Sequence, residues 1–128
     1  MAMTPKALVL DDSRVMRGIL TKILNARGFE TVQASNGLEA LEVMDRDGPT
    51  ISIVLADWNM PVMNGLEFVK ALRTRARFAH VPVMMVTSET DTEQVCAALT
   101  AGADEYIMKP FTAEIVDAKL QLLRAGRR

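Results

Sequence analysis

Short runs of apolar residues alternate along this chain with longer amphipathic stretches. The runs are rich in Val, Ile, Leu and Met, and three of them are nearly continuous, as expected of strands covered on both faces of a sheet. They occupy residues 6–10, 29–34, 51–56, 81–87 and 103–108. The pattern therefore predicts five short strands, with the three continuous ones inside the sheet.

Each apolar run is followed by a stretch with helical periodicity. In the first stretch, apolar residues recur at i, i+4 spacing from Val15 to Leu24, and Gly28 provides a stop. Side chains able to cap a helix stand at the expected starts of later helices: Asn36, Thr90 and Thr112. The chain thus alternates strand and helix five times.

This alternation indicates parallel strands joined by right-handed helical crossovers. An open sheet fits the length, whereas an eight-stranded barrel does not. We expect an α/β fold with a doubly wound, five-stranded parallel sheet and five helices. One domain would span residues 1–128, with its core over about 5–125.

Composition narrows the class of protein. The chain has 128 residues, 49% of them hydrophobic, and a formal net charge of −1. The balanced charge gives no sign of a nucleic-acid surface. No apolar run approaches the roughly 20 residues that cross a bilayer, and the N-terminus lacks a secretory signal pattern. We expect a cytoplasmic monomer that binds neither nucleic acid nor membrane.

Two residue types carry further expectations. The single cysteine, Cys96, excludes an internal disulfide, and its place in a helical pattern predicts a small buried side chain. Arg73, Arg75 and Arg77 stand at a helix end and are expected to extend into solvent. Neither group is expected to take part in chemistry.

Charged and hydroxyl side chains stand at the ends of four of the five strands or directly after them. They are Asp11 and Asp12, Asp57, Thr87 and Ser88, and Lys109 before Pro110. In such sheets ligands bind beyond the carboxyl ends of the strands, so these side chains should converge at one edge. Taken singly, each has an ordinary explanation as a helix cap, a turn residue or a surface lysine. Their recurrence at four matching strand ends favours a shared site.

Three aspartates brought together repel one another, and a divalent cation relieves the conflict. Oxygen ligands without His or Cys favour a hard ion such as Mg²⁺, with Mn²⁺ as an alternative. A metal and a lysine together stabilise charge on a transferring phosphoryl group, and a carboxylate can accept that group. The sequence therefore predicts phosphoryl-transfer chemistry at this edge.

Four segments resemble, in order and spacing, the signature of response regulator receiver domains. They are "VLDDS", "ADWNMPVMNGLE", "VTSE" and "AGADEYIMKPF". The resemblance spans about residues 5–125, so we expect no output domain. Within the family the chain is most similar to stand-alone receivers of chemotaxis. That likeness rests on Trp58, Asn59, Glu89 and Tyr106.

The resemblance implies a flavodoxin-like fold whose strands lie in the order 2-1-3-4-5. It also implies that Asp57 accepts a phosphoryl group from a histidine kinase. It further implies that Asp11, Asp12, Asp57 and the backbone carbonyl of Asn59 bind Mg²⁺. Lys109 would contact a phosphoryl oxygen. The bond between Lys109 and Pro110 would be cis, as in the family.

The resemblance also implies a switch and a partner surface. The Thr87 hydroxyl would move toward the phosphoryl group, and Tyr106 would turn inward, although an ordinary half-buried tyrosine is the alternative. The face made by the fourth helix, the fifth strand and the last helix would then bind a protein target. The residues that tune the lifetime of the phosphorylated state would be Asn59, Ser88 and Glu89.

Other functions remain open from the residues alone. An aspartate-nucleophile phosphatase of the haloacid dehalogenase type needs an acidic residue where Asn59 stands, two positions after Asp57. A flavin mononucleotide binder needs a phosphate cradle where this chain has "DDSRVM". Among receivers, a phosphorelay intermediate or a kinase regulator is the alternative to chemotaxis.

Overall fold

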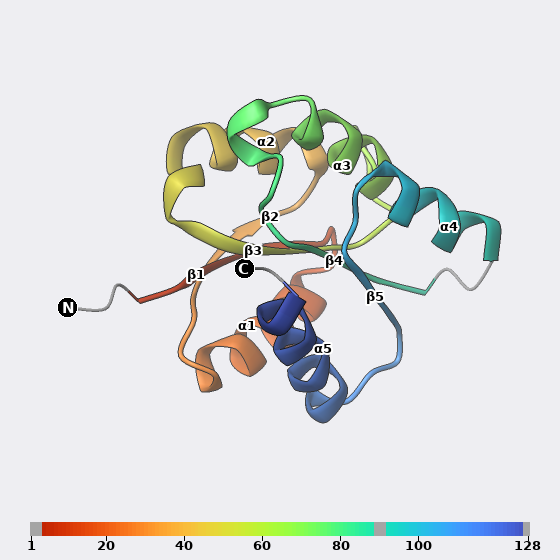
Figure 1. The fold of residues 1–128 in the computed structure, drawn as a ribbon. Helices are drawn as coiled ribbons and strands as arrows, with labels where there is room; N and C mark the ends of the chain where they lie inside the picture. The colour runs from red at the N-terminus through yellow and green to blue at the C-terminus, as the bar shows by residue number, and fades with distance from the viewer. Residues whose placement is uncertain (1–3, 89–91, 127–128) are drawn as a thin grey trace.

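The computed structural model describes residues 4–88 and 92–126, which form a parallel sheet with helices on both faces (Figure 1). Five strands pair in the order β2-β1-β3-β4-β5. The strands are β1 (Lys6–Leu10), β2 (Glu30–Ala34), β3 (Ile51–Ala56), β4 (Val83–Thr87) and β5 (Glu105–Met108). The helices are α1 (Arg14–Ala26), α2 (Gly37–Asp47), α3 (Gly65–Arg73), α4 (Thr92–Ala101) and α5 (Ala113–Gly126). The predicted doubly wound, flavodoxin-like fold is confirmed.

Three strands, β2, β4 and β5, begin later than predicted. In β2 and β5 the reason is that the end of the preceding helix uses the first residue of the run. The Phe29 N–H donates to the carbonyl of Leu24, and the Ala103 N–H donates to that of Ala98, each at 3.0 Å. In both cases a glycine with positive φ precedes the donor, Gly28 at 89° and Gly102 at 121°. These are helix-ending motifs that need the left-handed conformation of glycine.

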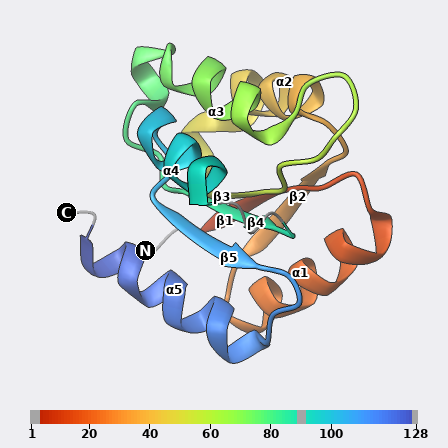
Figure 2. The same cartoon turned by 90° about the vertical axis from the view of Figure 1, so that its right-hand side faces the viewer.

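The sheet separates two hydrophobic cores. Leu8 of β1 and Val54 of β3 face the layer formed by α2, α3 and α4, whereas their neighbours Val9 and Leu55 face α1 and α5. Figures 1 and 2 show these helix layers on opposite sides of the sheet. The central strands are therefore apolar on both faces, which accounts for their nearly continuous apolar sequence.

Capping side chains fix where the helices begin. Ser13 accepts a hydrogen bond from the Met16 N–H at the start of α1, and Asn64 forms a reciprocal capping box with Glu67 at the start of α3. The other caps are Asn36 on α2 and Thr112 on α5. The cap predicted at Thr90 lies outside the described residues. These caps anchor helix starts beside the carboxyl edge of the sheet.

Two sequence expectations are wrong. Cys96 is exposed on α4 and not buried. Arg73 does not extend into solvent, because its guanidinium donates to the carbonyls of Gly102 and Phe78 and to Asp104. The Arg73 side chain is only 14% exposed, so it ties the end of α3 to the end of α4 and the start of β5.

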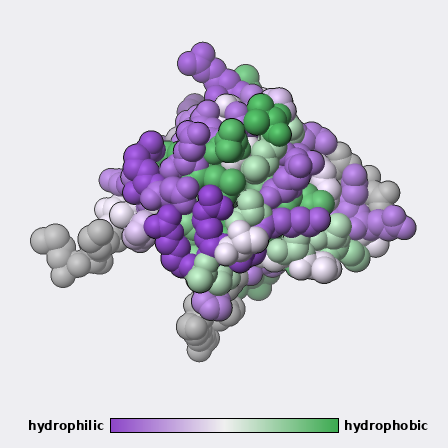
Figure 3. All heavy atoms as spheres, turned by 90° about the horizontal axis from the view of Figure 1, so that it is seen from above, coloured by the Kyte–Doolittle hydropathy of each residue, from purple (hydrophilic) through white to green (hydrophobic). Residues whose placement is uncertain are grey.

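The outer surface is that of amphipathic helices covering a sheet. From above, hydrophilic residues dominate the view, and hydrophobic ones lie among them (Figure 3). Within residues 4–88 and 92–126, no helix combines the length and apolar composition needed to cross a bilayer.

Candidate functional site

The register of the sheet brings Asp11 and Asp57 together. Leu10 at the end of β1 is the direct partner of Ala56 at the end of β3. One residue further, the Asp57 N–H donates to the Leu10 carbonyl at 2.8 Å, and the Asp11 N–H donates to the Ala34 carbonyl at 3.1 Å. Both aspartates therefore leave the sheet at the same carboxyl edge, fixed by backbone hydrogen bonds.

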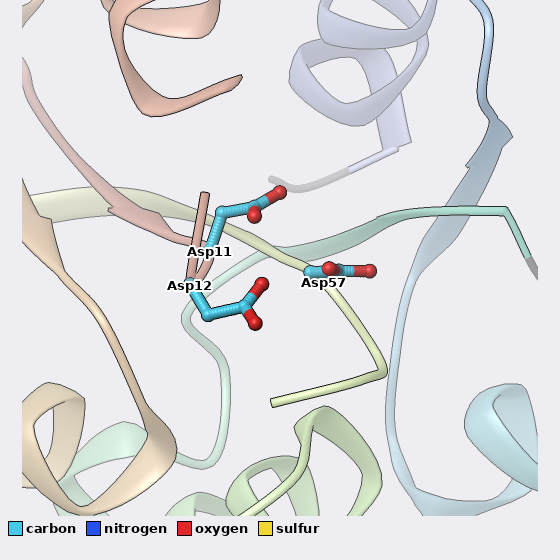
Figure 4. Close-up of side chains that lie close together, drawn as sticks. All are labelled: Asp11, Asp12 and Asp57. Carbon is cyan, nitrogen blue, oxygen red and sulfur yellow. The ribbon is translucent and has the colours of Figure 1, made fainter. Parts of the chain in front are cut away.

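Asp12 completes a cluster of three carboxylates (Figure 4). One carboxylate oxygen from each of Asp11, Asp12 and Asp57 lies within 4.8 Å of the others. Asp11 is 1% exposed and Asp57 is 7% exposed, whereas Asp12 is open to solvent. The cluster thus has a buried base and one accessible side.

The ammonium of Lys109 lies against the two buried carboxylates. Its Nζ stands 2.9 Å from Asp11 Oδ2 and 3.4 Å from Asp57 Oδ2. The Lys109 N–H donates to the Thr87 carbonyl at 2.9 Å, which sets the lysine at the edge where β4 and β5 end. The peptide bond between Lys109 and Pro110 is cis.

The environment of Asp57 disfavours its charged form. Burial raises the pKa of the Asp57 carboxyl above its ordinary value, and the charge of Asp11 adds to that rise. Lys109 and hydrogen bonds from Thr87 and the Trp58 N–H act in the opposite direction. An ionised Asp57 is therefore short of positive charge even with the lysine in place.

This donor set fits a hard divalent cation. The three carboxylates supply only oxygen, their charges exceed that of the single ammonium, and Asp12 keeps the site open to solvent. Mg²⁺ binds such oxygen ligands and retains several waters. The backbone of exposed Asn59 follows Asp57 by two residues, near enough along the chain to add a carbonyl.

The remaining predicted residues differ in how deeply they are buried. Thr87 is fully buried and its side chain is hydrogen-bonded to Asp57. Ser88 directly follows it and is exposed. Tyr106 is half-buried on β5, where it packs against the core on the α2–α3 side. Glu89 lies outside the described residues.

Sequence reasoning missed two groups that hold the acidic loop. The Ser13 N–H donates to Asp11 Oδ1 at 2.8 Å, and the Arg17 guanidinium donates to the Asp11 carbonyl at 2.6 Å. The apolar periodicity of α1 identifies its buried face, but it does not show what the polar residues on the rest of the helix contact. An arginine one turn after the cap of that helix was the available signal.

A doubly wound sheet with this acidic cluster at its carboxyl edge defines the receiver class of signalling domains. The chain belongs to the response regulator receiver domain family, whose model matches residues 7–121. Receiver domains bind Mg²⁺ at an acidic pocket of this kind. The family is therefore the predicted one, and it favours neither the phosphatase nor the flavin-binding alternative.

Its relatives are chemotaxis proteins of the CheY type. Chemotaxis protein CheY1 of Helicobacter pylori is 43% identical over 119 residues, covering 92% of this chain and 95% of the relative. A CheY homolog of Campylobacter jejuni is 40% identical over 117 residues, covering 91% and 89%.

A solved structure agrees with these relatives. Chemotaxis protein CheY4 of Vibrio cholerae superimposes with a TM-score of 0.88 at 34% identity, over 94% of this chain and 99% of that one. The predicted likeness to receivers of chemotaxis is confirmed. The chain is the receiver domain of a CheY-like response regulator, which implies chemotaxis signalling. The expectation that it carries no output domain stays a prediction.

Proposed function

We propose that the Asp57 carboxylate accepts a phosphoryl group from a phosphohistidine of a histidine kinase. One observation carries the proposal: Asp57 lies against Lys109 in a cluster with Asp11 and Asp12. A carboxylate oxygen would form the new P–O bond while the P–N bond breaks and the imidazole leaves with its electron pair. The chain would act as a signalling receiver and not as an enzyme, because it would catalyse only its own phosphorylation and dephosphorylation.

In this proposal Asp11, Asp12, Asp57 and the Asn59 carbonyl would hold Mg²⁺, with Mn²⁺ as an alternative. The cation supplies positive charge beside the transferring group. The Lys109 ammonium would donate to a phosphoryl oxygen, and its ion pairs with Asp11 and Asp57 already hold it at the right edge of the sheet.

Phosphorylation would be transmitted through Thr87. Its hydroxyl would donate to a phosphoryl oxygen, and its backbone is joined to β5, where Thr87 is the register partner of Met108. Tyr106, two residues earlier on β5, would turn inward as the β4 end moves. A charge added at one site would thereby bias a two-state element at another.

The proposed target surface is the α4–β5–α5 face. Figure 2 shows β5 between α4 and α5 on the side facing the viewer. Exposed apolar side chains support a protein partner here: Leu99 on α4, Met108 on β5 and Ile115 on α5. We propose that a cytoplasmic monomer uses this face in chemotaxis.

The lifetime of the phosphorylated state would depend on the residues at the open side of the site. Asn59 and Ser88 are both exposed, Asn59 two residues after Asp57 and Ser88 one residue after Thr87. Glu89 is the third proposed residue. Each would limit or guide the water that attacks the phosphoryl group.

Transfer from a purified, radiolabelled chemotaxis kinase tests the function. Label should move to this chain in the presence of Mg²⁺ and should not move to Asp57→Asn, whereas Asp45→Asn, which changes an exposed aspartate on α2, should be labelled normally. Equal labelling of Asp57→Asn would contradict the proposal. Onward transfer to a histidine-containing domain would favour the phosphorelay alternative over chemotaxis.

A further inference from the structure

The two adjacent aspartates are held very differently. Asp11 is bound through both carboxylate oxygens, by the Ser13 N–H and by Lys109, and through its backbone N–H. Within the described parts of the chain, 4–88 and 92–126, no protein group hydrogen-bonds or ion-pairs with the Asp12 carboxylate, which is exposed. The position of Asp12 must therefore come from its backbone.

Arg17 holds the peptide that leads into Asp12. Its Nη1–H donates to the carbonyl oxygen of Asp11 at 2.6 Å. That oxygen belongs to the planar unit between Asp11 and Asp12, so a hydrogen bond to it restrains the direction in which Asp12 leaves the chain. A charged donor makes this restraint stronger than a neutral one.

The guanidinium is itself fixed by a second chain of contacts. The Arg17 Nε–H donates to Gln33 Oε1 on β2 at 3.0 Å, and the Gln33 amide donates to the Thr21 hydroxyl on α1 at 3.2 Å. Arg17 is thus oriented by a strand and by its own helix. Such outer contacts commonly orient metal ligands in proteins.

Charge alone would make Arg17 unfavourable at this position. A cation beside an acidic cluster repels a divalent ion, so its removal should strengthen metal binding by electrostatics. Loss of a positioning contact should weaken metal binding. Because the two effects have opposite signs, the direction of the change identifies the role of Arg17.

We propose that Arg17 is a positioning residue for Mg²⁺ binding, which acts by holding the Asp11–Asp12 peptide so that the Asp12 carboxylate faces the site. This inference rests on the proposed function, because it assumes that the acidic cluster binds Mg²⁺. It adds a residue on α1 and, through Gln33, a residue on β2 to the determinants of metal affinity.

Calorimetric titration of unphosphorylated protein with Mg²⁺ tests the inference, and Trp58 fluorescence provides a second readout. Arg17→Met should weaken binding by about 10-fold, the lower end for loss of an outer contact to a ligand. Arg17→Lys keeps the charge and one donor and should restore part of that loss. Arg14→Met, the control, removes an exposed charge from the same helix and should leave affinity equal or slightly higher.

Gln33→Leu provides an independent test, because it keeps Arg17 but removes the hydrogen bond that orients its guanidinium. This change should weaken Mg²⁺ binding by about 3-fold, less than loss of the Arg17 contact itself. Chemical unfolding without metal confirms that each titrated variant is folded. If Arg17→Met and Gln33→Leu bind Mg²⁺ as tightly as wild type or tighter, the inference is wrong. If the wild type shows no Mg²⁺ binding, the proposed function fails with it, so the two failures are distinguishable.

Discussion

The ammonium of Lys109 and the carboxylate of Asp57 lie 3.4 Å apart, although they follow different strands, β5 and β3. The same ammonium is closer to the fully buried Asp11, at 2.9 Å. Before any phosphoryl group arrives, Lys109 therefore neutralises part of the acidic cluster. This arrangement predicts competition between the lysine and a bound cation.

Lys109→Met should destabilise the metal-free protein by about 1–3 kcal/mol, because the buried Asp11 loses its counter-charge. The same change should strengthen Mg²⁺ binding while it slows phosphorylation. Urea unfolding with a chelator and Mg²⁺ titration measure the two effects. Lys70→Met, at an exposed lysine of α3, should change stability by less than about 0.5 kcal/mol. Weaker Mg²⁺ binding by Lys109→Met would refute this competition.

Asp57 should make the metal-free protein less stable as the pH rises. Below its ordinary value of 3.8 the group is protonated both folded and unfolded, so it has no effect there. Burial raises the pKa of Asp57 in the folded state. Stability therefore falls as the pH increases from the ordinary value through the raised folded-state pKa.

Asp57→Asn should therefore be more stable than wild type at about pH 7 in chelator, and the difference should shrink toward about pH 4. Unfolding curves of both proteins across this range provide the measurement. Saturating Mg²⁺ should reduce the advantage of the variant. An advantage that stays constant with pH would mean that ionisation of Asp57 is not its cause.

Gly65 lies so close to the backbone of Asp57 that there is no room for a larger side chain. A Cβ there would overlap the carbonyl oxygen of Asp57, and the Gly65 N–H donates to the Trp58 carbonyl at 2.8 Å. Gly65→Ala should cost about 1–3 kcal/mol of stability by overpacking. Gly18→Ala in α1, where a Cβ meets nothing within 4 Å, should add about 0.5–1 kcal/mol. Thermal unfolding separates the two, and equal effects would mean that the Gly65 contact is relaxed in solution.

Arg73 and Arg77 differ in burial although both are ion-paired arginines near the end of α3. Arg73→Met removes hydrogen bonds to two carbonyls and to Asp104 and should cost about 2–4 kcal/mol. Arg77→Met breaks an exposed pair with Asp45 and should cost at most about 1 kcal/mol. Urea denaturation compares them; a loss for Arg77→Met as large as that for Arg73→Met would contradict the assigned roles.

Much of the fold and of the site could be predicted from local pattern. The apolar runs of β1 and β3 identify buried strands, and the residues just beyond them are fixed by parallel register. Asp11 and Asp57 meet because Leu10 and Ala56 are partners. Any sequence with this strand order brings the same positions together, so their proximity needs no knowledge of side-chain packing.

The errors arise where the deciding partner is distant in sequence or where the pattern is weak. Gly102 and Asp104, which accept hydrogen bonds from Arg73, lie between α4 and β5, far from Arg73 in the sequence. Arginines at helix ends are ordinarily solvated, so nothing in the sequence indicated this contact. Cys96 lies on α4, where only Ala98 among the helical residues is buried. The apolar residues of α4 are distributed around the whole helix, so their spacing does not identify a single buried face.

The contact of Arg17 with Asp11 could not be predicted from the sequence either. It depends on the direction of one carbonyl group in a loop, which neither periodicity nor spacing determines. Roles that depend on phosphorylation, those of Thr87 and Tyr106, likewise concern a second state of the molecule.

Intact mass spectrometry after incubation with a small acyl phosphate and Mg²⁺ tests the central claim most directly. The wild type should gain the mass of one phosphoryl group, with loss of that gain in excess chelator. Asp57→Asn should gain nothing, and Asp12→Asn should gain far less. A single phosphoryl group on Asp57→Asn, or labelling of the wild type that is unaffected by chelator, would contradict a Mg²⁺-dependent phosphoacceptor at Asp57.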